Sequence, residues 1–223
     1  MKLLIFTLFF IVHSTSLFAF DVEGKIKLDP PFPKPVEIEV TGDHVKTCGT
    51  KKISQRVLVS PEGFLANAVI ELKGAANPGF QNQNEKYVLD QMHCEFSPHV
   101  LLIPKGSKLE IRNSESVVHN VRAFDESALM QFNLPSPIKG YLIKKQFDKA
   151  GHYIVRCGIH KWMHAQLIVQ EHPFYALTND SGYFKISGIP EGNYILKIWH
   201  ESLGEKTIPV NSKTSNVLVT FNS

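Results

Sequence analysis

The sequence is poor in cysteine and lacks long apolar runs beyond its first residues. Only three of its 223 residues are cysteine, which excludes the dense disulfide framework of small secreted scaffolds. No stretch after residue 20 is long and apolar enough to cross a bilayer as a helix, so we expect no membrane span in the mature chain. Lysine and arginine are dispersed along the chain, which argues against a nucleic-acid partner. A hydrophobic content of 43% supports one or two packed domains.

The first 19 residues have the pattern of a secretory signal peptide. Lys2 supplies a positive charge, residues 3–12 form a short apolar run, and residues 17–19 read Leu-Phe-Ala, an acceptable cleavage site. The apolar run is too short to span a bilayer, although a retained N-terminal anchor is the alternative. Cleavage removes one lysine and no acid, so Lys plus Arg falls from 24 to 23 against 21 acids. We therefore expect a periplasmic or secreted protein with a net charge near +2.

No stretch shows a convincing helical period. From residue 21 onward the chain reads as short alternating strands, such as VEGKIKL at 22–28 and NAVIELKG at 67–74, separated by glycine, proline and asparagine. This pattern is typical of an all-β sandwich architecture. Residues 75–85 are polar and rich in Gly, Pro and Asn, which predicts a linker. One or two helical turns are expected at 126–132.

The densest group of soft metal donors lies at residues 157–163. The sequence there is Cys-Gly-Ile-His-Lys-Trp-Met, between two segments of strand composition, HYIVRC and AQLIVQ. A loop between two strands lets Cys157, His160 and Met163 converge on one point, and His119 in VVHNVRAF offers a second imidazole. One thiolate, two imidazoles and a weak thioether are the donor set of a mononuclear electron-transfer copper site.

Each of these donors also has an ordinary structural explanation. Cys157 is the kind of residue that is often a buried thiol, His160 could be a solvated loop histidine, and His119 could be a satisfied core histidine. Met163 follows a tryptophan and could serve packing alone, while His164 is a rival axial donor. Cys157, His160 and Met163 lie within seven residues, and with His119 they complete the donor set of a trigonal copper site, which favours ligation over these structural roles.

Two details of these segments resemble a known family. His119-Asn120-Val121 and the Cys-x-x-His-x-x-Met spacing make residues 84–171 similar to a cupredoxin, most closely a blue copper protein of the amicyanin and plastocyanin type. The resemblance implies a Greek-key β-sandwich and one type 1 copper ion. It implies His119, Cys157 and His160 as strong trigonal ligands and Met163 as the long axial ligand. It also implies that Asn120 bonds across to the cysteine loop, and that Trp162 and the His160 ring edge form the electron port.

The C-terminal segment resembles a second family. In residues 172–223, Asn-Asp-Ser-Gly at 179–182 and Pro-Glu-Gly at 190–192 each lead into a strand, as in carboxypeptidase regulatory-like, or transthyretin-like, β-sandwiches. The opening strands of that family's pattern are missing here and appear upstream at 24–26 and 68–72. We therefore predict that 20–75 and 172–223 form one outer sandwich with the cupredoxin inserted. The simpler alternative is a cupredoxin with extra N-terminal strands and a C-terminal appendage.

An odd number of cysteines in an exported protein needs an explanation. If Cys157 is a copper ligand, Cys48 and Cys94 remain as a pair that could form a disulfide. Two separate buried thiols are the alternative, because sequence alone does not show whether the two Cα atoms are close enough.

The four donors fill the expected coordination sphere and leave no position for a substrate. This predicts an electron carrier rather than an enzyme, with redox partners such as a periplasmic dehydrogenase or a c-type cytochrome. Three alternatives remain: an open-site copper enzyme or sensor in which Met163 does not bind, a copper storage or delivery protein, and a structural module with a degenerate motif.

Overall fold

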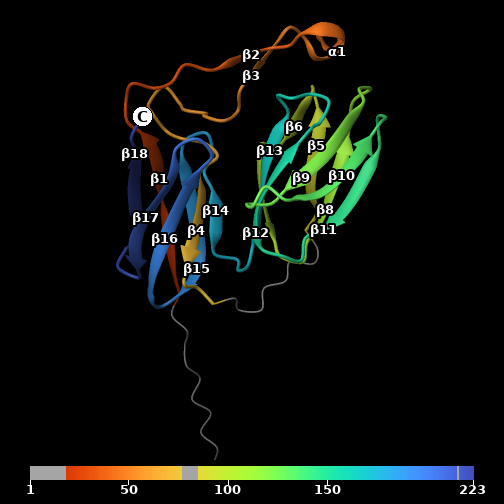
Figure 1. The fold of residues 1–223 in the computed structure, drawn as a ribbon. Helices are drawn as coiled ribbons and strands as arrows, with labels where there is room; N and C mark the ends of the chain where they lie inside the picture. Colours follow the sequence, from red (N-terminus) through yellow and green to blue (C-terminus); the bar gives the residue numbers. More distant parts are fainter. Residues whose placement is uncertain (1–18, 77–84, 215) are drawn as a thin grey trace, which may run out of the picture.

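The computed structural model describes residues 19–76, 85–214 and 216–223. Over these residues the chain forms two β-sandwiches that lie side by side, with an N-terminal arm running from one to the other (Figure 1). The predicted signal peptide, apart from Ala19, and most of the predicted linker at 75–85 lie outside the described residues.

The outer sandwich combines strands from both ends of the chain. One sheet has the order β15-β1-β18 and the other has the order β14-β4-β16-β17. Their bounds are β1 Ala19–Leu28, β4 Val69–Lys73, β14 Tyr175–Leu177, β15 Tyr183–Pro190, β16 Asn193–His200, β17 Gly204–Asn211 and β18 Asn216–Phe221. Strands of the first segment therefore pair with strands of the last, as a discontinuous sandwich requires.

Strand β1 shows how the sequence builds this pairing. Its side chains alternate, with Val22, Ile26 and Leu28 buried in the core of the outer sandwich, as expected for a strand with one face covered. Gly24 lies against β18, where an added Cβ would come within 2.1 Å of the Val217 carbonyl oxygen. A side chain at this position would push the two strands apart, so the parallel β1–β18 pairing needs glycine.

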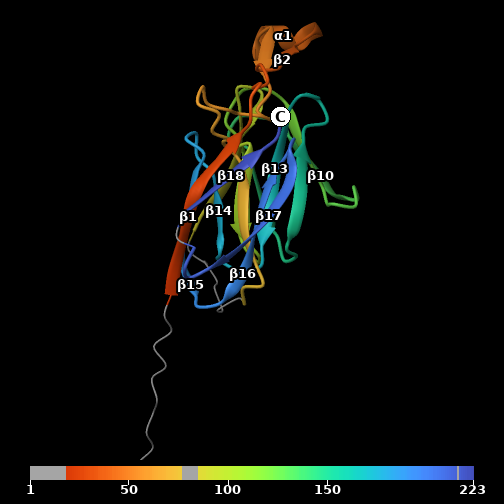
Figure 2. The ribbon, with the colours of Figure 1, turned by 90° about the vertical axis from the view of Figure 1, so that its left-hand side faces the viewer.

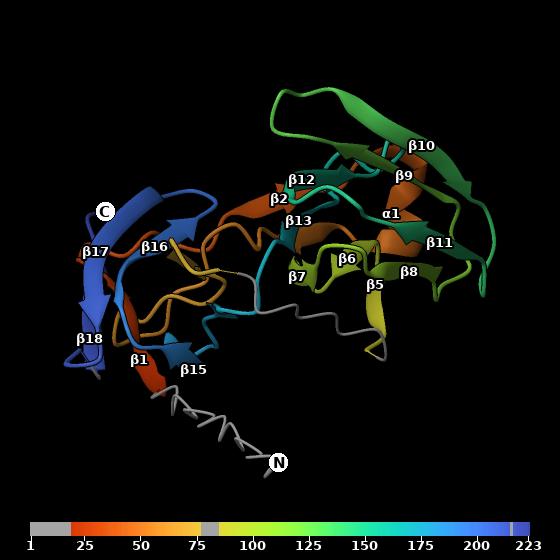
Figure 3. The ribbon, with the colours of Figure 1, turned by 90° about the horizontal axis from the view of Figure 1, so that it is seen from below.

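The inner sandwich occupies the middle of the chain. A five-stranded sheet has the order β10-β9-β12-β13-β7, and it faces a four-stranded sheet of order β11-β8-β5-β6. Their bounds are β5 Tyr87–Met92, β6 Glu95–Ser97, β7 Val100–Pro104, β8 Lys108–Asn113, β9 His119–Phe124, β10 Met130–Ser136, β11 Leu142–Gln146, β12 Gly151–Arg156 and β13 His164–Gln170. Each sandwich has its own hydrophobic core, and Figure 3 shows the two bodies beside each other, seen from below.

The arm connects the outer sandwich to the end of the inner one. It consists of β2 Glu37–Glu39, β3 Lys51–Ile53, a 3-10 turn at Gly42–His44 and the short helix α1 Val45–Cys48. The arm projects beyond the strand ends (Figure 2). Val40 and Cys48 are buried in the core of the inner sandwich, and a disulfide joins Cys48 to Cys94 at the start of β6. The arm is therefore anchored covalently to the inner sandwich.

The helical turns expected at 126–132 are not formed. Residues 126–129 make the tight loop between β9 and β10, and β10 begins at Met130. The side chain of Asp125 accepts hydrogen bonds from the N–H groups of Ser127 and Leu129, and Ala128 adopts a φ of 60°. These local bonds favour a turn over a helix. In the described part of the chain, no helix has the length and apolar character needed to span a membrane.

Candidate metal centre

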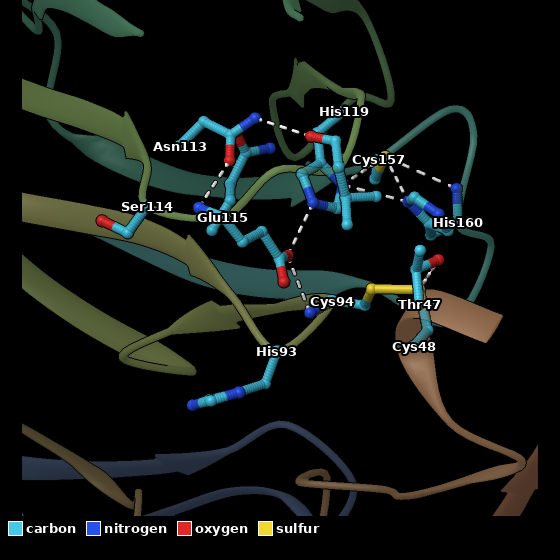
Figure 4. Close-up of polar contacts among 12 residues, drawn as sticks. Thr47, Cys48, His93, Cys94, Asn113, Ser114, Glu115, His119, Cys157 and His160 are labelled. Carbon is cyan, nitrogen blue, oxygen red and sulfur yellow. Dashed lines mark hydrogen bonds and ion pairs between the residues drawn. A yellow bond between two sulfur atoms is a disulfide. The ribbon is translucent and has the colours of Figure 1, made fainter. Parts of the chain in front are cut away.

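Three of the predicted ligands meet at one end of the inner sandwich. His119 begins β9, Cys157 directly follows β12, and His160 lies in the loop between β12 and β13. The Cys157 sulfur lies 3.9 Å from His119 Nδ1 and 3.8 Å from His160 Nδ1, and the two Nδ1 atoms are 3.0 Å apart (Figure 4). All three side chains are buried: Cys157 is 5% exposed, and His119 and His160 are each 1% exposed.

Hydrogen bonds hold the ligand loop in a compact form. The Cys157 N–H donates to the Met163 carbonyl at 3.1 Å, and the Met163 N–H donates to the His160 carbonyl at 3.0 Å. The His160 N–H points at the Cys157 sulfur, 3.4 Å away. The loop therefore closes on itself with its donors facing inward.

Asn120 ties the ligand loop to the strand that carries His119. Its Oδ1 accepts a hydrogen bond from the Gly158 N–H, and its Nδ2 donates to Asn133 Oδ1 at 2.9 Å. This is the bond across to the cysteine loop that the resemblance implied for Asn120. It joins β9, β10 and the loop into one frame around the three donors.

Glu115 fixes the orientation of the His119 ring. Its Oε1 lies 2.7 Å from His119 Nε2 and also accepts the Cys94 N–H at 2.8 Å (Figure 4). Because a carboxylate oxygen accepts, His119 carries its proton on Nε2, and its Nδ1 lone pair faces Cys157 and His160. Glu115 was not among the predicted site residues, because it lies in a polar loop four residues before His119 and no motif marks it.

The environment favours a thiolate at Cys157. Burial alone would raise its pKa, but interactions with His119 and His160 and with backbone N–H groups lower the pKa to about 5. Burial opposes the charged form of His119, yet its contacts with Cys157 and Glu115 raise its pKa overall. The cysteine is thus held in the form that binds metals and is also the nucleophilic form.

The donor set fits a copper ion. The Cys157 sulfur and two imidazole nitrogens converge inside a buried space, and buried charges in proteins are paired or coordinate metals. Donors that bind one ion with bonds of about 2.0 to 2.3 Å lie roughly 3 to 4 Å apart, and the three separations fall in this range. A His2Cys set is characteristic of electron-transfer copper sites.

The two candidates for the axial position are placed differently. Met163 is 2% exposed and belongs to the same core as Cys157. His164 is turned away, because its Nδ1 lies 3.1 Å from the Trp162 carbonyl oxygen and its Nε2 lies 3.0 Å from Glu201. His164 is therefore not available as an axial ligand, whereas the axial role of Met163 stays a prediction.

The His160 ring edge, which the resemblance placed in the electron port, is buried rather than exposed to solvent. The ring of His44 in the arm lies against the ring of His160, with their centroids 4.7 Å apart. The ring of Trp162 also lies against the His160 ring, at a centroid distance of 5.1 Å. His160 Nε2 is buried and has no hydrogen-bond partner among the residues that the structure describes. Trp162 is only partly buried and its Nε1 donates to the Cys94 carbonyl at 3.0 Å. The arm thus covers the ligand that the sequence placed at the surface.

The chain was compared with known proteins, and the solved structures to which it is similar include copper proteins. No protein-family profile and no curated protein matches the chain. A mutant of amicyanin in its Cu(I) form is 18% identical, with a TM-score of 0.34 over 45% of this chain and 98% of that one. The purple cupredoxin from Nitrosopumilus maritimus is 24% identical, with a TM-score of 0.32 over 45% and 97%. The copper-containing nitrite reductase from Thermus scotoductus is 22% identical, with a TM-score of 0.34 over 44% of this chain and 25% of that one.

The expected all-β fold with two β-sandwiches is confirmed by the sheet topology, and membership of the cupredoxin family stays a prediction. The likeness of the outer strands to a carboxypeptidase regulatory-like sandwich stays a prediction.

Proposed function

We propose that this protein binds one type 1 copper ion and carries single electrons between redox partners outside the cytoplasm. The observation that carries this proposal is the buried triangle of Cys157, His119 and His160, whose three donor atoms lie 3.0 to 3.9 Å apart. The buried Met163 beside it would supply the weak fourth ligand.

Copper held by these residues would supply one-electron chemistry by passing between its +1 and +2 states. The task of the protein is then to keep the donors in place while the charge changes. Asn120 fixes the cysteine loop, Glu115 fixes the His119 ring, and the Cys48–Cys94 disulfide fixes the arm above His160. A frame of this kind lowers the rearrangement that each electron step requires.

Electrons would enter and leave through the rings that cover His160. His44 and Trp162 both contact the His160 ring and both are partly exposed. We infer that Trp162 and His44 together replace the His160 edge as the outer end of the electron path. The partner would be a redox protein such as a periplasmic dehydrogenase or a c-type cytochrome.

Two features support the part of this proposal that places the protein outside the cytoplasm. The disulfide between Cys48 and Cys94 is of the kind that persists in the periplasm or outside the cell, and the first 19 residues have the pattern of a signal peptide.

Two other copper functions fit less well. Copper delivery requires a ligand that a chelating partner can reach, but all three donors are at most 5% exposed. An open-site enzyme or sensor requires an exchangeable position that a substrate can reach, and His44 of the arm covers the His160 ring.

Electron exchange with a c-type cytochrome tests the proposal. The copper-loaded, reduced protein is mixed with an oxidised cytochrome and both spectra are followed by stopped flow. We expect one electron per protein to pass to the cytochrome, and zinc-loaded protein, which cannot change oxidation state, to transfer none. Reduced protein that passes electrons only to nitrite or oxygen would point to the enzyme instead.

A further inference from the structure

A second cluster of side chains that could hold a metal ion lies where the two sandwiches meet. His99 precedes β7 and His164 begins β13, both in the inner sandwich, while Glu201 follows β16 of the outer sandwich. His99 Nε2 lies 2.5 Å from Glu201 Oε2, and His164 Nε2 lies 3.0 Å from Glu201 Oε1. The two imidazole rings are 4.9 Å apart. The three groups thus come from three separate parts of the chain.

The group is largely shielded from water. The side chains of His99, Glu201 and His164 are 4%, 9% and 16% exposed. Burial alone would raise the pKa of Glu201, but its bonds with His164 and His99 hold the pKa well below the ordinary value. Glu201 is therefore a buried carboxylate, and buried charges in proteins are paired or coordinate metals.

The hydrogen bonding of His164 leaves a lone pair facing this carboxylate. Its Nδ1 lies 3.1 Å from the Trp162 carbonyl oxygen, which can only accept, so Nδ1 carries a proton. In the neutral ring Nε2 then has a lone pair, and it lies 3.0 Å from the carboxylate oxygen. Two acceptors at this distance need a positive group beside them; in this structure Arg56 Nε supplies it, and a metal ion could take its place. A backbone carbonyl that orients the far nitrogen is also the usual support of a ligating histidine.

A small cavity lies directly beside the two histidines. Its volume is about 20 Å³, and His99, His164 and Met163 are among its lining residues. A space of this size holds a single water molecule or a small ion.

We propose that His99, His164 and Glu201 form a second metal site, for a divalent ion of borderline character such as zinc or copper(II). Two imidazoles and a carboxylate are ligands that such ions bind with a fourth position left open. Of the three proposed ligands, His164 also lines a larger cavity of about 800 Å³, together with Arg56 and Ser202. The ion would join the two sandwiches, because its ligands come from both.

Arg56 of the arm stands at the outer side of the site. Its Nε lies 3.2 Å from Glu201 Oε1 and 3.4 Å from His164 Nε2. A guanidinium at this position competes with a bound cation, so metal binding requires Arg56 to move aside. Its side chain is 58% exposed, so it can turn toward solvent with little loss of packing. Removing the charge of Arg56 should therefore strengthen metal binding, whereas a purely ionic network offers no metal site to strengthen.

Zinc titration of the full mature protein tests this inference. Protein with copper already in the first site is titrated with Zn²⁺ by calorimetry at neutral pH, and we expect one further equivalent to bind. Glu201→Gln and His99→Gln should each weaken this binding at least about tenfold, as loss of a ligand does. Arg56→Gln should bind zinc more tightly than the wild type.

His152→Gln is the matched control. His152 lies at the same junction, with its ring 4.5 Å from Trp199 of the outer sandwich and its Nε2 2.7 Å from Gln166. Its backbone N–H donates to Glu126, but no carboxylate contacts its ring nitrogens among the described contacts. This variant should bind zinc like the wild type. Circular dichroism of each variant checks that it is folded.

Two results would overturn the second site. One is that neither the wild type nor Arg56→Gln binds a further equivalent of zinc. The other is that a further equivalent binds but Glu201→Gln and His99→Gln leave its affinity unchanged. The inference does not depend on the first site, since Cys157→Ser protein should still bind one zinc ion that Glu201→Gln removes. The thiolate absorption band reports separately on the proposed copper centre.

Discussion

The ring of His44 lies against the ring of His160 at a centroid distance of 4.7 Å and an interplanar angle of 71°. The two residues belong to different parts of the fold, since His44 is in the arm and His160 is in the ligand loop. The Cys48–Cys94 disulfide holds this contact in place. A candidate copper ligand is thus covered by a segment that leaves the outer sandwich and returns to it.

Removing the disulfide should expose the candidate copper centre. The double variant Cys48→Ala/Cys94→Ala loses a cross-link between residues 46 positions apart, which costs about 4 kcal/mol of unfolding free energy on the chain-entropy model. Because the arm is then held only by packing, a chelator should remove copper faster than from the wild type. Urea unfolding and the rate of copper loss measure the two effects. Equal rates of copper loss in both proteins would show that the arm does not shield His160.

Asn120→Ala should loosen the ligand loop. It removes the acceptor of the Gly158 N–H, and loss of a group that orients a ligand segment costs about tenfold or more in metal affinity. Asn133→Ala removes only the partner on the other side of Asn120 and serves as the control. Competition with a copper chelator measures both affinities, and similar values for the two variants would contradict this role of Asn120.

Glu115→Gln should weaken copper(II) more than copper(I). The substitution keeps the shape of the side chain but removes the negative charge 2.7 Å from His119 Nε2, and that charge favours the more highly charged ion. Copper(II) affinity should fall about 10- to 100-fold, and the reduction potential should rise. Cyclic voltammetry determines the potential, and an unchanged or lower value would be inconsistent with this account.

Met163 is tested by changing its donor atom. Met163→Gln should keep the metal and shift the reduction potential, because a harder axial ligand alters the balance between the two copper states. If Met163→Ala leaves both the visible spectrum and the potential untouched, then Met163 is a packing residue and not the axial ligand.

Stability should fall in mild acid because of His172. This residue is buried, and burial lowers its pKa below the ordinary value of 6.5. The folded protein therefore binds fewer protons than the unfolded chain, so the contribution is complete above pH 6.5 and is lost as the pH falls toward the lower folded-state pKa. His172→Asn keeps an acceptor for the Phe174 N–H but does not titrate.

Thermal unfolding between pH 7.5 and 5 measures this difference. The melting temperature of His172→Asn should change less with pH than that of the wild type. His93→Asn is the control, because His93 is exposed and has a φ of 56°, which asparagine tolerates. An equal pH dependence in His172→Asn and the wild type would mean that another group causes the loss.

The parts of the site that lie close together in the sequence could be predicted from it. Cys157, His160 and Met163 fall within one loop, so spacing and residue type marked them as candidate ligands, whereas the bond of Asn120 to the cysteine loop was implied by the family resemblance. The pairing of the first and last segments was predicted from the second family resemblance, whose opening strands lie at 24–26 and 68–72. The helical turns predicted at 126–132 were wrong, because the side chain of Asp125 accepts backbone hydrogen bonds that stabilise a tight turn.

The features that the sequence could not predict depend on contacts between distant segments. His44 reaches His160 only because Val40 and Cys48 pack into the inner core. The contact of Glu201 with His99 joins residues 102 positions apart. No local pattern marks such residues, because their partners are chosen by how the two sandwiches and the arm are packed together.

The measurement that tests the central claim most directly is a visible absorption spectrum of the mature protein during titration with copper(II). The account predicts an intense red-region band from a thiolate–copper bond, bleached by a mild reductant and restored by an oxidant. Cys157→Ser should lack the band and remain folded. A weak or absent band in the wild type at full copper occupancy would contradict a type 1 copper centre formed by Cys157, His119 and His160.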